Sequence, residues 1–242
     1  MNLNKTFLSI FLALFIFNLS NISAVRPCRS CSREHTLHTK HANVDAVIKI
    51  LRRLPESNAV IEQALRQGSI SVEVSKGRMP FKAMWLNGPR KIVLERGASR
   101  QPGSLLSHLL FELMNALSED QFLELCDLAL DGQIDCDTYV EAVERIEYRN
   151  MIRADAIIEK GLSLGIFPPA PKWEIIDDFA THYKIQQLAG HSPLIAREYQ
   201  EMRGRRHFSP YRGTVQNLKQ MSRREKESQI ESLYSRYVIE PG

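Results

Sequence analysis

Hydrophobic residues recur along the chain with two different periods, and each period predicts a different kind of element. Apolar residues three and four positions apart indicate helices that bury one face, whereas strict alternation places Ile70, Val72 and Val74 on one face of a strand. Glycine and proline mark the breaks between elements. The predicted helices cover residues 44–54, 58–67, 104–117, 119–130, 138–160, 173–188 and 192–203, and the predicted strands cover residues 69–75, 81–86 and 91–95.

The order of these elements predicts the fold class. Two helices come first, three strands follow, and the remaining elements are helices, which is the order of an α+β protein. Asn87-Gly88 lies between two apolar runs and predicts a hairpin, so we expect a small antiparallel meander of about three strands. The expected protein is mainly helical, with one α+β domain over residues 43–200 and a basic helical tail over residues 201–242.

Residues 1–24 have the pattern of a bacterial-type secretory signal peptide. Lys5 supplies the positive charge, residues 7–17 are apolar except for Ser9, and a polar stretch ends at Ala24, where cleavage is expected. The apolar run is too short for a membrane-spanning helix, which needs about 20 residues. We therefore expect an exported protein, secreted or periplasmic, without a transmembrane segment once the signal peptide is removed.

Export would place the four cysteines where disulfides can form. Cys126 and Cys136 flank a predicted turn, so a bridge between them is a candidate among the three pairings that four cysteines allow. Residues 25–42 form a predicted linker rich in cysteine and histidine, and thiolates and imidazoles at such spacing can bind zinc or copper. The candidate ligands are Cys28, Cys31, His35, His38 and His41, although the segment matches no standard zinc finger.

The helix predicted over residues 104–117 is apolar on most of its circumference, which is typical of a buried helix. His108, Glu112 and Asn115 nevertheless fall within one sector of about 60°, because positions i, i+4 and i+7 share a helix face. We call these three residues the polar stripe. Burying a histidine and a carboxylate without partners is costly, so the stripe must face something polar.

A candidate partner lies on the long helix predicted over residues 138–160. Glu147 is near the middle of its apolar face, Asn150 is inside that face, and Glu144 is at its edge. We expect Glu147 and Glu144 to approach the polar stripe. A buried cluster of this kind would have perturbed pKa values, which makes it a candidate functional site.

The strand over residues 91–95, a short loop and the sequence SLLSHLLFELMNA resemble the core of the zincin metallopeptidases, in which a strand precedes the helix with the HExxH motif. LFELMNA is similar to the common zincin form with HELxHA. In this register Glu112 matches the general base, whereas Phe111 and Asn115 stand where the zinc-binding histidines belong. The resemblance implies a degenerate metallopeptidase whose zinc site is lost, because neither residue replaces an imidazole. Glu144 or Glu147 would match the carboxylate ligand that some zincins carry on a downstream helix.

Three interpretations of the polar stripe stay open. It can be a structural network, the commonest role of buried polar residues. It can belong to a degenerate zincin that binds a protein or peptide without cutting it and needs no cofactor. Alternatively, Glu112 acts as the general base of a hydrolase together with His108 and Glu147, with zinc as the cofactor. Among the functions we favour the binding protein, so we lean against an enzyme.

Charge and motifs limit the other partners. A net charge of +4 is too small to indicate a nucleic-acid partner on its own, and no nucleotide-binding loop or nucleophile elbow occurs. Residues 195–242 hold ten lysines and arginines against six acidic residues, so the tail is a candidate for contact with an anionic surface. We expect an unidentified protein or peptide partner and no specific nucleic acid. The histidines at 182, 191 and 207 are expected on the surface or at helix edges.

Overall fold

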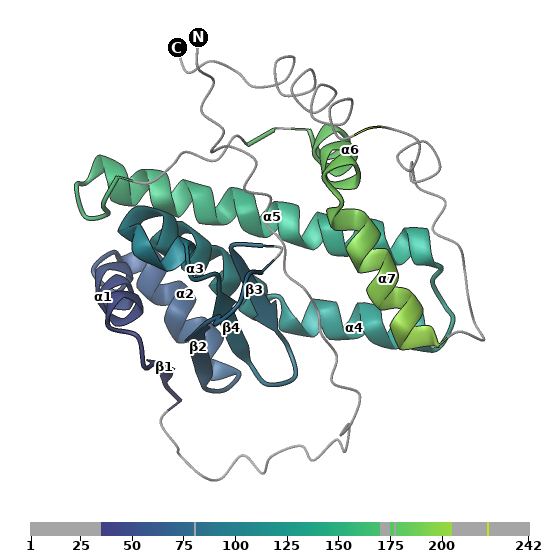
Figure 1. Cartoon of the computed structure of the whole chain (residues 1–242), viewed down its shortest axis with the longest axis horizontal. Helices are drawn as coiled ribbons and strands as arrows, with labels where there is room; N and C mark the ends of the chain where they lie inside the picture. Colours follow the sequence, from purple (N-terminus) through teal and green to yellow (C-terminus); the bar gives the residue numbers. More distant parts are fainter. Residues whose placement is uncertain (1–34, 80, 170–174, 177, 205–221, 223–242) are drawn as a thin grey trace. The chain divides into compact units, whose positions relative to one another are not determined.

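The computed structural model describes residues 35–79, 81–169, 175–176, 178–204 and 222 (Figure 1). The predicted signal peptide, the first two cysteines and nearly all of the predicted basic tail lie outside these residues. The chain groups into two compact units. The sheet unit consists of the described residues up to 117 together with 157–169, and the helical unit consists of residues 118–156 and the described residues from 175 onward.

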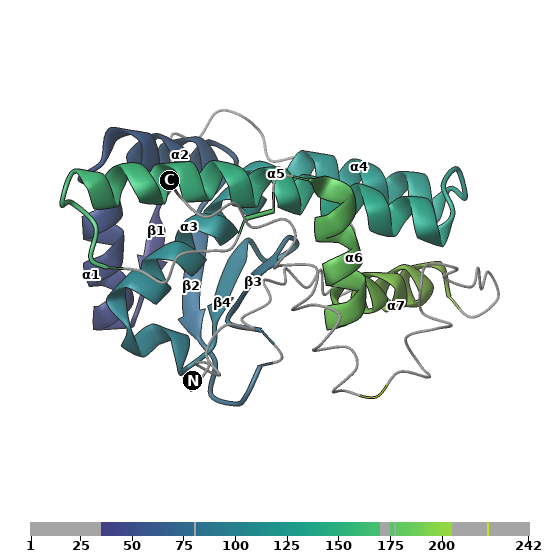
Figure 2. The ribbon, with the colours of Figure 1, turned by 90° about the horizontal axis from the view of Figure 1, so that it is seen from above.

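The sheet unit contains a four-stranded sheet with the strand order β1–β2–β4–β3 (Figure 2). β1 pairs with β2, and β2 with β4, in parallel, whereas β3 and β4 pair antiparallel. The α+β class is confirmed, but the expected antiparallel meander of three strands is wrong because β4 lies between β2 and β3. The strands span Leu37–Thr39 (β1), Ile70–Val74 (β2), Ala83–Leu86 (β3) and Lys91–Leu94 (β4).

The central position of β4 follows from its burial. Ile92 and Leu94 are fully buried, and the parallel register sets them beside Val72 and Val74 of β2. Alternate side chains of a strand point to the same face, so the apolar positions of both strands form one continuous surface. The hairpin predicted at Asn87-Gly88 connects β3 to β4, and its turn extends to residue 90.

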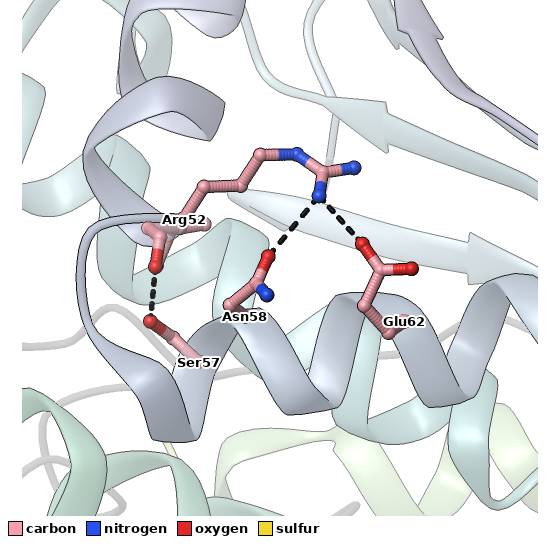
Figure 3. Close-up of polar contacts among 5 residues, drawn as sticks. Arg52, Ser57, Asn58 and Glu62 are labelled. Carbon is pink, nitrogen blue, oxygen red and sulfur yellow. Dashed lines mark hydrogen bonds and ion pairs between the residues drawn. The ribbon is translucent and has the colours of Figure 1, made fainter.

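Helices α1 (Ala42–Leu51) and α2 (Pro55–Arg66) connect β1 to β2. Pro55 is the first residue of α2, a position where its missing N–H costs no hydrogen bond. Polar side chains hold the corner between the helices (Figure 3). The Ser57 hydroxyl donates to the Leu51 carbonyl, and Arg52 Nη1 donates to Asn58 Oδ1 at 3.1 Å and to Glu62 Oε1 at 2.6 Å.

Helix α3 (Pro102–Leu117) is the core of the sheet unit. It follows β4 after a short 3-10 turn (Ala98–Arg100) and contacts α1, α2, β3 and β4. Every residue from 105 to 116 is buried, which confirms the helix predicted to be buried on most sides. Burying one large aliphatic side chain contributes about 1.5–3 kcal/mol, so the leucines of α3 stabilise this unit substantially.

The helical unit is built from α4, most of α5, and the consecutive helices α6 and α7 (Figure 1). α6 starts later than residue 173, because the carboxylate of Asp178 caps it by accepting from the N–H groups of Ala180 and Thr181. Within the described part of the chain, no helix is both long and apolar enough to cross a membrane. The helices span Glu119–Leu130 (α4), Cys136–Ser163 (α5), Phe179–Ala189 (α6) and His191–Arg203 (α7).

Gly161 does not end α5, although a glycine after an amphipathic run predicts a helix end. The helix continues to Ser163, and the ring of Phe167 packs directly over Gly161. A Cβ atom at this position would lie 2.1 Å from Phe167 Cδ2, far inside van der Waals contact. The glycine therefore makes room for a buried aromatic ring and is not a stop signal.

Candidate functional site

The polar stripe lies on α3, and the structure buries all three of its residues. His108 is 4% exposed, and Glu112 and Asn115 are fully buried. Asn115 Nδ2 donates a hydrogen bond of 3.2 Å to Glu112 Oε2. The backbone N–H of Trp85, on β3, donates to the same carboxyl group. Glu112 is thus held inside the core of the sheet unit by one side chain and one backbone group.

Burial determines the charge of Glu112. Loss of hydration raises its pKa from 4.5 to about 8, because a carboxylate is poorly stabilised in the core. The hydrogen bonds from Asn115 and the Trp85 backbone favour the charged form, but they lower the pKa by less than burial raises it. Glu112 is therefore mostly protonated at neutral pH, and only its small ionised fraction can accept a proton as a general base.

His108 is neutral as well. Burial, and to a smaller extent the positive charge of Lys82, lowers the pKa of His108 to about 4. A neutral imidazole and a neutral carboxyl group do not form an ion pair, so near pH 7 the stripe carries little charge. This charge state fits a buried polar network better than a catalytic pair.

The two positions where the zincin register requires histidines are closed to solvent. Phe111 is 1% exposed and Asn115 is fully buried. Phenylalanine offers no ligand atom, and the Asn115 amide is engaged with Glu112. The residues on this helix therefore do not fit the zinc site of that family.

A second buried polar group lies in the helical unit, between α5 and the first turn of α7. Glu144 and Glu147 are one helical turn apart on α5, and His191 is the first residue of α7. His191 Nδ1 lies 2.9 Å from Glu144 Oε1, and His191 Nε2 lies 3.4 Å from Glu147 Oε2. We call these three residues the Glu–His cluster. At most 5% of any of the three side chains is exposed.

The geometry of the Glu–His cluster suits a metal ion. One ligand atom from each side chain lies within 4.8 Å of the other two, and the three ligands are two carboxylates and one imidazole. Among the described residues, the Glu–His cluster is the one place where at least three potential metal ligands lie this close together. The other predicted partner on the long helix, Asn150, instead exchanges hydrogen bonds of 3.0 and 3.1 Å with Ser118.

Two further residues of the helical unit surround the cluster. Ser192 Oγ donates a hydrogen bond of 2.6 Å to Glu144 Oε1. His182, on α6, has its pKa lowered to about 4, because burial outweighs the opposing effect of the Glu144 charge. The ring centroid of His182 lies 4.8 Å from that of Tyr148 on α5. The cluster is therefore enclosed by α5, α6 and the start of α7.

The local sequence explains why His191 faces α5. Gly190 has φ 94° and ψ 7°, a left-handed conformation that a residue without Cβ adopts easily. It is both the C-cap of α6 and the N-cap of α7, so the two helices join at one residue. His182 and His191 were expected on the surface or at helix edges; a surface position is wrong, since they are only 8% and 1% exposed. Periodicity missed them because each lies near a helix end, where few neighbours define a face.

The predicted approach of Glu147 and Glu144 to the polar stripe stays a prediction. Both glutamates are buried, as their position on an apolar face predicts. Their observed contacts are with His191 and Ser192 of the helical unit, whereas the stripe belongs to the sheet unit. The histidine that joins the two glutamates was not among the predicted site residues.

Cys126 and Cys136 are both free thiols, so the predicted bridge between them is not formed. Cys126 Sγ lies 3.5 Å from the Tyr139 hydroxyl, and Cys136 Sγ accepts from Gln200 Nε2 at 3.5 Å. Each thiol has its own neighbours in the core of the helical unit. Burial raises the pKa of both thiols to about 11, which keeps them protonated and unreactive.

The predicted cysteine- and histidine-rich linker is in part ordered structure. Residues 37–39 form β1, which the sequence did not predict, and His38 lies in that strand. His35 Nδ1 lies 2.7 Å from the Leu65 carbonyl oxygen, and His41 occupies the N-cap position of α1. These histidines do not gather into a metal-binding group among the described residues. Cys28 and Cys31 lie outside those residues, so a site that includes them stays a prediction.

Each unit also has a surface hollow. In the helical unit, a groove of about 650 Å³ is lined by residues of α4, α5 and α6, most of them apolar, together with two arginines and one glutamate. In the sheet unit, a cavity of about 430 Å³ lies beyond the carboxyl ends of β2 and β4, the edge where parallel sheets bind ligands. Its lining is His41, Val74, Ser75, Lys76, Arg96 and Arg100, which favours an anion over a cation.

The chain was compared with known protein families, curated proteins and solved structures. No protein-family model, no curated protein and no solved structure matches the chain.

Proposed function

We propose that the protein is an exported binding protein on a zincin-like scaffold, which lacks the zincin zinc site and holds a protein or peptide partner without cleaving it. The observation that carries this proposal is the environment of Glu112. Its carboxyl group is fully buried, hydrogen-bonded to Asn115 and protonated near neutral pH. A general base needs to be within reach of water, which the burial of Glu112 prevents, and its raised pKa leaves only a minority of it ionised at neutral pH.

The topology of the sheet unit supports the scaffold part of the proposal. β4 leads through a short 3-10 turn into α3, which is the strand-then-helix order on which the resemblance rests. β3 forms an antiparallel edge to an otherwise parallel sheet and donates a backbone hydrogen bond to Glu112 of α3. The helix with the degenerate motif therefore packs against the sheet at its antiparallel edge.

The groove of the helical unit is the surface that we propose for the partner. Its apolar lining includes Leu125 and Leu128 of α4 and Phe179 of α6. Arg145 and Arg149 of α5 also line it, and Glu124 is the acidic residue among its lining. A mainly apolar lining with two arginines, of which Arg145 is paired with Glu141, fits an amphipathic segment of another protein with acidic residues beside its apolar face.

Two leucines on α4 give a matched test of this surface. Leu125 lines the groove, whereas Leu123 is 40% exposed and does not line it. We expect a panel of acidic amphipathic peptides, measured by fluorescence anisotropy, to contain binders to the mature protein. Leu125→Arg should weaken binding by about tenfold or more and Leu123→Arg by less than about twofold. The absence of any binder, or equal effects of both variants, would contradict the proposed surface.

The alternative function is a hydrolase in which Glu112 acts as the base with His108 and Glu147. A single assay separates it from the binding protein. The mature protein and its Glu112→Gln variant are incubated with a broad peptide mixture, with and without zinc, and the products are identified by mass spectrometry. We expect no cleavage by either protein. Cleavage by the wild type that Glu112→Gln abolishes would establish the hydrolase and refute the binding protein.

A further inference from the structure

We infer that the Glu–His cluster of the helical unit binds one divalent first-row transition metal ion, with Glu144, Glu147 and His191 as its ligands. Its three ligands belong to the helical unit, whereas the residues of the zincin motif lie on α3 of the sheet unit. The inference therefore does not rest on the proposed function. It would hold whether the protein binds or hydrolyses its partner.

The first argument is the proximity of the ligand atoms. Zinc binds carboxylate oxygen and imidazole nitrogen at about 2.0–2.2 Å, which sets neighbouring ligand atoms roughly 3–4 Å apart. The ligand atoms of the cluster already lie within 4.8 Å of one another. Small side-chain movements would therefore bring them to bonding distance.

The second argument is charge. The Glu144 side chain is 1% exposed and that of Glu147 is 5% exposed. Two carboxylates so close together in the core repel each other, and burial removes the water that would screen them. Among the described residues, His191 is the basic side chain beside Glu144, at 2.9 Å, and it carries a charge only when it is protonated. One imidazolium ion can neutralise only one of the two carboxylates, whereas a divalent cation neutralises both.

The third argument is that the cluster is not satisfied by its own hydrogen bonds. Both ring nitrogens of His191 are close to carboxylate oxygens, yet neither makes a hydrogen bond of acceptable angle among the described residues. Glu144 Oε2 also has no hydrogen-bond partner among them. Buried polar atoms without partners are rare and mark strain, a function or a missing ion. Here they belong to side chains whose ligand atoms lie within 4.8 Å of one another.

The ligand set decides the class of metal. Two carboxylates and one imidazole suit zinc, manganese and iron, whereas calcium takes oxygen ligands alone and copper(I) prefers sulfur. Three protein ligands leave a fourth position open to water or to a substrate group, as in catalytic zinc sites. Ser192 donates to Glu144 Oε1 and would hold that carboxylate in place, which is the role of a positioning residue.

Calorimetric titration of Zn²⁺ into the metal-free mature protein tests the site. A Cys28→Ser/Cys31→Ser background removes the competing candidate ligands of the N-terminal segment. We expect one zinc ion per chain. Changing a residue that only hydrogen-bonds a metal ligand weakens metal binding about 10- to 100-fold, so loss of a direct ligand in His191→Gln should weaken it more than about 100-fold.

Two further variants sharpen this test. Ser192→Ala should weaken zinc binding only about tenfold, as expected for a positioning residue. Glu141→Gln is the matched control, because Glu141 lies one turn before the cluster on α5 and pairs with Arg145. It should leave zinc affinity unchanged.

A second measurement does not depend on how well the variants fold. Zinc should raise the thermal unfolding temperature of the Cys28→Ser/Cys31→Ser protein, since a ligand that binds only the folded state stabilises it. Binding of Co²⁺ should give a visible absorption spectrum that zinc displaces. No binding by this protein, or binding that persists unchanged in His191→Gln, would overturn the inference.

Discussion

The charge of Glu112 leads to a sharp prediction about stability and pH. Glu112 has a pKa of about 8 in the folded protein against 4.5 for an ordinary glutamate. Between these values the folded state holds a proton that the unfolded state has released, so the free energy of unfolding falls as pH rises. Below pH 4.5 both states are protonated, and above pH 8 both are ionised. The loss is therefore confined to the interval between them.

The size of the effect follows from the same two values. Each pH unit within the interval costs about 1.4 kcal/mol, so the full loss is about 5 kcal/mol. This loss is comparable with the whole stability of a small domain, which is about 5–15 kcal/mol. Glu112→Gln removes the titrating group and keeps nearly the same shape. We expect this variant to lack the loss, and so to become the more stable protein as pH rises toward 8.

The assay is urea denaturation at a series of pH values from 5 to 9. Trp85 is fully buried and donates its backbone N–H to Glu112, so its fluorescence reports on the sheet unit. Trp173 is replaced by phenylalanine in both proteins to keep the signal local. Glu62→Gln is the comparison for an exposed carboxylate of α2; it also loses the contact with Arg52, so its pH slope and not its stability offset is compared.

The pH slope is the decisive quantity, not the offset between the two proteins. Glutamine can lose one of the hydrogen bonds made by Glu112, which would shift its stability by about 1 kcal/mol at every pH. Parallel stability curves for wild type and Glu112→Gln between pH 5 and 8 would refute the argument. Glu112 would then be ionised in the folded state, and the reason for excluding it as a general base would fail.

Three further outcomes are expected. Gly161→Ala should destabilise the protein by about 1–3 kcal/mol in urea denaturation because its Cβ meets Phe167, and the cost should vanish in a Phe167→Ala background. In a variant without the two N-terminal cysteines, Cys126 and Cys136 should not react with a thiol reagent at pH 8 until the protein unfolds. Rapid labelling of the native protein would contradict their burial and their pKa values of about 11. Asn150→Ala should cost about 1–3 kcal/mol in thermal or chemical denaturation by leaving a buried hydroxyl group without its partner, and an unchanged midpoint would show that this pair is not stabilising.

The sequence predicted local features well because they depend on neighbouring residues. The alternation over residues 69–75 and the Asn87-Gly88 turn predicted β2 and the hairpin of β3 and β4. Strand partners depend on residues far apart in the chain, so the parallel pairing of β2 with β4 could not be predicted from periodicity. β1 has only three residues, too few to show alternation.

For the candidate site, too, the sequence predicted the local feature but not the long-range contact. The burial of Glu144 and Glu147 followed from their place on an apolar helix face, and the structure confirms it. Their contact with His191 joins residues more than 40 positions apart. A pattern that runs along one helix cannot identify a partner on another. A buried glutamate with no cation on the same face of its helix was the available signal, and it indicated that a partner existed but not which one.

The one-residue joint between α6 and α7 has a consequence for recognising related proteins. Gly190 is the whole linker between the two helices, so no loop residues are present that could accommodate a change of length. Inserting one residue after it would rotate α7 by about 100° and turn His191 away from α5. Replacing it by a β-branched residue would strain the left-handed backbone by about 1–2 kcal/mol. A sequence that shares this metal site should therefore show two glutamates three positions apart on a long helix, followed later by a glycine or asparagine directly before the histidine.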